Sequence, residues 1–230
     1  MLEVTGLNQF YGGSHILRDV TLQVPQGSLT VLLGRNGVGK TTLMRCLMGV
    51  VRSKSGTIAW RGQALDGLAP PARVARGIAY VPQGRDIFAR LTVEENLLVG
   101  AATKRHVSHV PERIYTLFPV LKDMRKRRGG DLSGGQQQQL AIGRALMSEP
   151  SLLILDEPTE GIQPSIISEI GRTLRELVDQ SGMTVLLVEQ YYDFAKAIAD
   201  HYWVMRRGEI VASGEGAQMD ACGVREMIAV

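Results

Sequence analysis

A glycine-rich string that ends in a lysine and a hydroxyl residue is the part of this sequence best suited to chemistry. Residues 34–41 read GRNGVGKT, which is the GxxxxGK[ST] pattern of a phosphate-binding loop. Glycine lets backbone amides approach an anion because no Cβ intervenes, and the helix expected next points its free N–H groups at the same place. The predicted contacts to a nucleotide are therefore Gly34, Asn36, Gly37, Gly39, Lys40, Thr41 and Thr42.

The side chains of this loop have separate roles. Lys40 is expected to reach the β- and γ-phosphates, and the Thr41 hydroxyl is expected to bind Mg²⁺. Thr42 is a plausible second hydroxyl donor. A chance glycine-rich turn is the alternative, but the loop follows an apolar strand pattern and opens a helical one, which favours the phosphate site.

Two adjacent acids follow a second apolar segment. Leu152–Leu155 is wholly apolar, and Asp156 and Glu157 come directly after it. In P-loop enzymes an aspartate at the end of such a strand holds Mg²⁺, and Glu157 is placed to orient or deprotonate an attacking water. The acids followed by Pro158 could also be the start of an ordinary loop, but the phosphate loop upstream favours catalysis.

The elements that must position these residues alternate between strand and helix. Helices are predicted at 40–48, 93–100, 112–121, 134–147, 164–181 and 191–198. Strands are predicted at 3–5, 20–24, 28–33, 56–60, 78–81, 152–155, 184–188, 202–205 and 209–212. This alternation predicts an α/β fold whose core sheet is mainly parallel, with helices on both faces.

Bulk composition is that of an ordinary globular chain. The 230 residues are 44% hydrophobic and 21% charged, with a net charge of +3, which is too small to argue for nucleic acid. Cys46 and Cys222 match no metal spacing, so free thiols in a reducing compartment are expected. No signal peptide and no apolar run of membrane-spanning length are recognised, so any spanning would be done by other chains.

A third sequence motif indicates which family of P-loop proteins the chain resembles. Residues 132–136 read LSGGQ, between the phosphate loop and the acidic pair. With these motifs in order, the chain resembles an ABC transporter ATP-binding subunit from Tyr11 to about Gly214. The resemblance implies a P-loop NTPase of one domain, 1–230, with an N-terminal antiparallel β subdomain and an inserted α-helical subdomain at about 84–148 that includes LSGGQ.

The resemblance also implies roles for further residues. Tyr11 matches the aromatic that stacks on adenine, although an edge-strand aromatic is the alternative. Gln83 matches the glutamine that touches Mg²⁺ and the water. The signature residues match those that close over the γ-phosphate of the opposite subunit's ATP, so that two domains pair head-to-tail around two ATP molecules; they are Ser133, Gly134, Gly135 and Gln136.

Two positions depart from the pattern of many relatives. Gln190 stands where a histidine often contacts the γ-phosphate, and a glutamine amide can donate a hydrogen bond but carries no charge. It is kept in the predicted catalytic set beside Glu157 and Gln83. Gln163 stands where an aspartate is usual in the loop after the acidic pair.

The strings that contain Gln163 and Gln190 resemble those of the branched-chain amino acid and amide importer branch of the family. Within it, the strings around Gln83 and Gln163 are most similar to the urea-uptake ATPase subunit. The implied function is ATP hydrolysis that powers import of urea or short amides through separate permeases. Branched-chain amino acid import is the alternative, and a soluble ABC ATPase acting on nucleic acid or ribosomes is the alternative of a different class.

The resemblance implies the surroundings of the protein as well. ATP and Mg²⁺ are the expected cofactors. The expected partners are a second ATPase subunit, identical or a sister, two membrane permease subunits and a periplasmic or extracellular solute-binding protein, with no nucleic acid. The expected location is peripheral, on the cytoplasmic face of the bacterial inner membrane.

Overall fold

The computed structural model describes residues 1–104 and 107–229, and its centre is a six-stranded sheet with the order β10-β9-β3-β8-β7-β6. Residues 105, 106 and 230 belong to the predicted spans but lie outside the described residues. Neighbouring strands pair in parallel except β10 and β9, so the prediction of a mainly parallel core is confirmed. The strands are β3 (Leu29–Leu33), β6 (Ile78–Val81), β7 (Leu152–Asp156), β8 (Thr184–Glu189), β9 (His201–Arg206) and β10 (Glu209–Glu215).

A second, antiparallel sheet of order β2-β1-β4-β5 is built from the N-terminal part of the chain, as predicted. Its first two strands are longer than their sequence patterns suggested, because bulges in the β1–β2 ladder interrupt the simple alternation of buried and exposed residues. The short strand β5 was not predicted. The strands are β1 (Leu2–Tyr11), β2 (Ser14–Val24), β4 (Ser55–Trp60) and β5 (Gln63–Ala64).

The central strands β3 and β7 are buried on both faces, which explains why their sequences are largely apolar, with Thr30 in β3 and Asp156 at the end of β7 as the exceptions. Alternate residues of β7 enter different cores: Leu153 and Leu155 pack with the helices on one side, while Leu152 and Ile154 pack toward the antiparallel sheet on the other. Helix α1 (Lys40–Leu47) belongs to this second core. The expectation of helices on both faces is therefore confirmed, and on this face α1 packs together with the antiparallel sheet.

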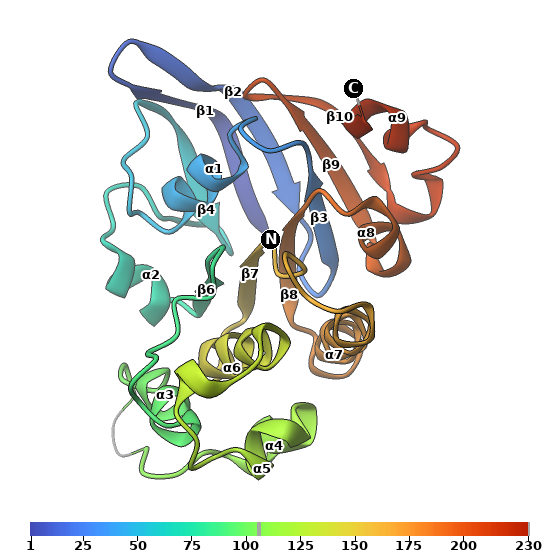
Figure 1. The fold of residues 1–230 in the computed structure, drawn as a ribbon. Helices are drawn as coiled ribbons and strands as arrows, with labels where there is room; N and C mark the ends of the chain where they lie inside the picture. The colour runs from blue at the N-terminus through green and yellow to red at the C-terminus, as the bar shows by residue number, and fades with distance from the viewer. Residues whose placement is uncertain (105–106, 230) are drawn as a thin grey trace.

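The other face of the central sheet is covered by three helices (Figure 1). They are α6 (Gly134–Leu146), α7 (Pro164–Ser181) and α8 (Tyr192–Ile198). Helix α7 begins with Pro164 at its first turn and ends at Gly182, whose φ is +63°. Both are favourable positions, since proline lacks only an N–H that would be free anyway and glycine accepts the left-handed conformation. Among the described residues, none of these or any other helix is long and apolar enough to cross a bilayer.

The segment between β6 and β7 is largely helical and gathers at one end of the molecule beside α6 (Figure 1). Its helices before α6 are α3 (Val93–Val99), α4 (Glu112–Leu117), α5 (Pro119–Asp123) and the short 3-10 turn η1 (Gly129–Asp131). The single helix predicted over 112–121 is wrong. Pro119 disfavours helical geometry at Phe118, whose φ of −135° and ψ of 76° separate α4 from α5.

Other short elements were missed because they are too brief to establish a period. They are α2 (Pro70–Ala75), the 3-10 turn η2 (Gly216–Gln218) and α9 (Val224–Ala229). The sheet topology nevertheless predicts the position of the functional site. The carboxyl ends of parallel strands share one edge of a sheet, so the residues after β3, β7 and β8 meet there.

Candidate functional site

The phosphate loop joins β3 to α1 in a backbone path that requires glycine. Gly37 and Gly39 have φ values of +81° and +114°. A Cβ at Gly34 would lie 2.6 Å from the Met205 carbonyl oxygen. The loop is therefore fixed by close backbone packing, and α1 follows it directly with its N-terminal amides facing the loop.

A cleft of about 410 Å³ opens over this loop. It gathers residues predicted from four separate parts of the sequence. Tyr11 is 43% exposed at its rim, and Glu157 lies at its inner end. The lining residues are Tyr11, Ile16, Asn36, Gly37, Gly39, Lys40, Thr41, Thr42, Gln83 and Glu157. Of these only Ile16 was absent from the predicted set.

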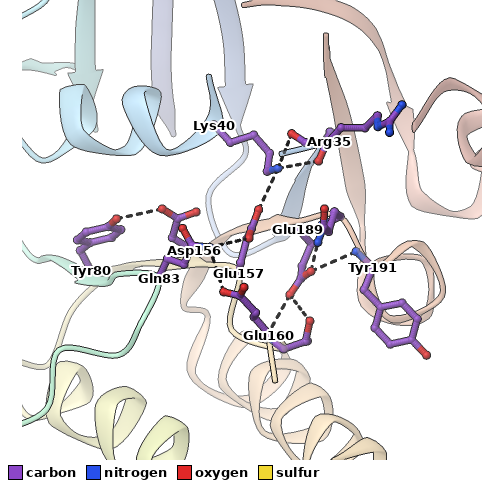
Figure 2. A network of polar contacts seen from close by, with 12 residues as sticks. Arg35, Lys40, Tyr80, Gln83, Asp156, Glu157, Glu160, Glu189 and Tyr191 are labelled. Carbon is purple, nitrogen blue, oxygen red and sulfur yellow. Dashed lines mark hydrogen bonds and ion pairs between the residues drawn. The ribbon is translucent and has the colours of Figure 1, made fainter. Parts of the chain in front are cut away.

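Lys40 is buried and turned toward the protein (Figure 2). Its Nζ lies 2.9 Å from Glu157 Oε1 and donates to the carbonyl oxygens of Gly34 at 2.6 Å and Arg35 at 3.0 Å. The ammonium thus takes its contacts from the loop carbonyls and the carboxylate. Glu157 itself has φ of +49°, an unfavourable conformation for this residue, and its N–H donates to the Val188 carbonyl.

Asp156 has the features of a cation ligand. Its Oδ2 accepts a hydrogen bond from the Tyr80 hydroxyl at 3.2 Å, while its Oδ1 is buried and has no hydrogen-bond partner among the described residues. Burial raises the pKa of Asp156, and the nearby Tyr80 and Thr41 hydroxyls act in the opposite direction. A buried carboxylate oxygen without a partner, beside the Thr41 hydroxyl, is suited to Mg²⁺.

Gln83 connects the cleft to the segment that leads into the helical region. Its Nε2 donates to Glu157 Oε2 at 3.2 Å and to Glu160 Oε2 at 3.0 Å. Two residues later, Arg85 Nη2 donates to the Glu160 carbonyl at 3.0 Å. The glutamine predicted to touch the water is therefore already hydrogen-bonded to the predicted base (Figure 2).

Two residues at this edge were not predicted as functional. Tyr80 lies on β6 and reaches Asp156 because β6 pairs with β7. Glu189 ends β8 and accepts hydrogen bonds from Thr159, Gln190 and Tyr191. A sequence signal for Glu189 existed: a carboxylate that closes a largely apolar strand, as Asp156 closes β7, is placed at the same sheet edge.

Gln190 is one of the predicted site residues that do not line the cleft. Its side chain is exposed, although its backbone N–H donates to Glu189 Oε2 at 3.1 Å. Its proposed contact with a γ-phosphate stays a prediction.

The signature residues line a different hollow, of about 850 Å³, together with Gly161 and Gln163. Ser133 and Gln136 form a capping box at the start of α6: Ser133 Oγ accepts from Gln136 N at 3.3 Å, and Gln136 Oε1 accepts from Ser133 N at 2.9 Å. None of these residues lines the Lys40 cleft. The phosphate loop and the signature of one chain are thus two separate surfaces.

The arrangement matches known proteins in sequence as well as in shape. A family model described as ABC transporter matches residues 17–160. The high-affinity branched-chain amino acid transport ATP-binding protein BraG of Pseudomonas aeruginosa is 42% identical over 221 residues, which cover 95% of this chain and 94% of that protein. This chain belongs to the ABC transporter family.

Further comparisons agree with that assignment. The probable branched-chain amino acid transport ATP-binding protein LivF of Archaeoglobus fulgidus is 37% identical over 95% of this chain and 94% of its own length. The solved structure of a nucleotide-free ATP-binding cassette from an ABC transporter has a TM-score of 0.87 at 26% identity, covering 100% of this chain and 97% of that one. The chain is therefore an ATP-binding ABC ATPase, as the residues indicated.

Proposed function

We propose that this protein is the ATP-hydrolysing subunit of an importer and that two ATPase subunits bind ATP between them. The observation that carries this proposal is the separation of the two half-sites. Lys40 and Glu157 line one hollow, and Ser133 and Gly134 line another. A signature that caps the γ-phosphate must then come from a second ATPase subunit, identical or a sister.

The chemistry assigned to the first half-site is phosphoryl transfer to water. Lys40 leaves Glu157 to bind the β- and γ-phosphates, and the freed Glu157 carboxylate accepts the proton of the attacking water. The Gln83 amide, which contacts Glu157 at 3.2 Å, orients that water. Tyr11 at the rim stacks on adenine.

Thr41 and Asp156, with Gln83, are the residues that would hold Mg²⁺. The ion supplies neutralisation of charge on the β- and γ-phosphate oxygens. The buried Oδ1 of Asp156, without a partner among the described residues, supports this assignment.

The second half-site contributes amides rather than a base. The first N–H groups of a helix have no intrahelical partner, and α6 begins at Gly134. Because the capping box already holds Ser133 and Gln136, the amides of Gly134 and Gly135 are the donors assigned to a phosphate.

For the solute, we propose branched-chain amino acids. The relatives described above carry that name in both a bacterium and an archaeon. The expectation of urea or short amides receives no support from these comparisons, so the alternative stated from the sequence is the better choice. The proposed partners are two permease subunits and a solute-binding protein, and the proposed location is the cytoplasmic face of the membrane. Residues at about 84–148 are proposed to form a helical subdomain.

Uptake measurements test this function. A strain that lacks the gene should lose accumulation of labelled leucine, isoleucine and valine, and the wild-type gene should restore it while Lys40→Ala should not. Labelled urea provides the comparison. Loss of urea uptake with normal uptake of the three amino acids would reject the proposed solute, and normal uptake of every solute would reject the importer role.

A further inference from the structure

The buried carboxylate of Glu189 stands between the two loops that follow β7 and β8 (Figure 2). Its residue is only 1% exposed. Oε1 accepts hydrogen bonds from the Thr159 hydroxyl at 2.8 Å and the Thr159 N–H at 3.2 Å. Oε2 accepts from the N–H groups of Gln190 at 3.1 Å and Tyr191 at 3.2 Å. Each oxygen is therefore held by two donors, one pair from each loop.

This pattern favours an ionised carboxylate. Three of the four groups around Glu189 are backbone N–H groups, which can only donate, and the Thr159 hydroxyl is placed as a fourth donor; a carboxylate satisfies all four, whereas an amide would turn an NH₂ group toward one pair of them. No ion pair offsets the charge within the described residues. Burial raises the pKa of Glu189, and the four hydrogen bonds act in the opposite direction. Burying an unpaired carboxylate costs folding free energy, so a charge at this position is tolerated only because the four hydrogen bonds stabilise it.

The bonded atoms adjoin the residues assigned to chemistry. Thr159 lies two residues after Glu157, whose own N–H is bonded to the Val188 carbonyl at 2.9 Å. Gln190 directly follows Glu189. We infer that Glu189 is a positioning residue for ATP hydrolysis, whose carboxylate clamps the backbone after Glu157 to the backbone that carries Gln190, so that both loops take one fixed arrangement at the γ-phosphate. This inference rests on the proposed role of Glu157.

A positioning role for Glu189 and a purely structural role predict different effects of mutation. If the clamp holds the base in place, weakening it lowers the rate of the chemical step while ATP binding to the phosphate loop is kept. Weakening a purely structural contact would lower the stability of the fold and leave kcat per folded molecule unchanged. The two roles therefore separate in kcat, KM and the unfolding temperature.

Thr159 gives the cleanest test, since its hydroxyl can be removed without opening a cavity. Thr159→Val deletes one donor to Glu189, and Thr159→Ser keeps it. Thr184→Val is the matched control, because Thr184 is also buried, lies at the end of β8 opposite Glu189 and accepts one hydrogen bond from the Gly27 N–H at 2.9 Å. Glu189→Gln, the more severe change, disturbs the donors at one oxygen of the clamp.

Steady-state ATPase kinetics with Mg-ATP should separate these variants. We expect Thr159→Val to lower kcat about tenfold and Glu189→Gln about a hundredfold, with KM for ATP within about twofold, since hydrogen bonds to a charged group are among the stronger ones. Thr159→Ser should recover kcat to within about twofold of wild type, and Thr184→Val should lower only the unfolding temperature.

Two results would overturn the inference. One is wild-type kcat in folded Thr159→Val and Glu189→Gln while Glu157→Gln is inactive, which rejects the clamp and leaves the proposed function intact. The other is a loss of kcat in Thr184→Val equal to that in Thr159→Val, which makes the effect one of general destabilisation. Wild-type turnover in Glu157→Gln itself would instead reject the catalytic assignment on which the clamp depends.

Discussion

Lys40 Nζ lies 2.9 Å from Glu157 Oε1, and the two side chains are only 3% and 5% exposed. The cation expected to bind phosphate and the carboxylate expected to activate water are therefore each other's partners in this structure. In the proposed mechanism a nucleotide replaces the carboxylate at Lys40 and releases Glu157 for catalysis, so nucleotide binding and activation of the base would be one exchange of ion-pair partners.

Replacing Glu157 with glutamine should therefore affect binding and turnover in opposite directions. The amide no longer competes for the Lys40 charge, so we expect ATP to bind about tenfold more tightly, equivalent to about 1.4 kcal/mol. Turnover should be lost because an amide accepts no proton from water. Calorimetric titration with Mg-ATP and a phosphate-release assay measure the two effects.

The same variant should expose the subunit pairing. Light scattering is expected to report mostly monomer without nucleotide and association when ATP is present but not hydrolysed. Lys40→Ala is the control, since it removes the phosphate contact and should stay monomeric with ATP. A dimer of unchanged mass with and without nucleotide would contradict this expectation.

Replacing Tyr80 with phenylalanine should weaken the response to magnesium rather than the chemistry. The Tyr80 hydroxyl donates to Asp156 Oδ2 and leaves Oδ1 as the buried oxygen without a partner among the described residues. Loss of such a supporting bond typically costs about 10–100-fold in metal affinity. We expect a higher magnesium concentration for half-maximal ATPase activity, with kcat nearly restored at saturating magnesium. An unchanged magnesium titration would show that Tyr80 does not orient Asp156.

Tyr11 should contribute to nucleotide affinity through its ring. It is 43% exposed at the rim of the cleft, where a base can stack on it. Stacking of this kind is worth about 1–3 kcal/mol, so Tyr11→Ala should raise KM for ATP by about fivefold or more with little change in kcat. Tyr11→Phe keeps the ring and should behave as wild type. Equal KM values in both variants would assign adenine to another surface.

The two cysteines should differ sharply toward a thiol reagent. Burial raises the pKa of Cys46 to about 11, whereas Cys222 is exposed. The reactive thiolate of Cys46 is therefore scarce at pH 8 as well as shielded. Ellman's reagent should titrate one thiol in the native protein and two in denaturant. Rapid native reaction of both thiols would show that the core around α1 opens readily.

Much of this site followed from sequence because its groups lie next to one another in the chain. Gly34 to Thr42 form one continuous segment that runs from the loop into α1, and Asp156 and Glu157 directly follow the apolar run Leu152–Leu155. Residues in such local patterns lie close together in space because they are close in sequence, so their proximity can be predicted without knowing the rest of the fold. The core sheet followed similarly, since strands buried on both faces are largely apolar.

The remaining features depend on contacts between distant segments. Tyr80 reaches Asp156 only because β6 pairs with β7 in the register Ile78 to Leu152. Glu189 acts on Thr159, 30 residues earlier in the chain. The break between α4 and α5 was local and could have been predicted, because Pro119 restricts Phe118.

The central claim is that one subunit's phosphate loop is completed by the other's signature, and mixing two inactive variants tests it most directly. Lys40→Ala removes a phosphate contact of the loop, and Gly134→Asp places a carboxylate where a phosphate should bind. Each variant by itself should lack the ATPase activity of the wild-type chain. In mixed dimers one of the two shared sites regains both intact halves. We predict that an equimolar mixture recovers up to about a quarter of wild-type turnover, since about half the dimers are mixed and each has one sound site. No recovery, from folded variants that associate with each other, would contradict the account.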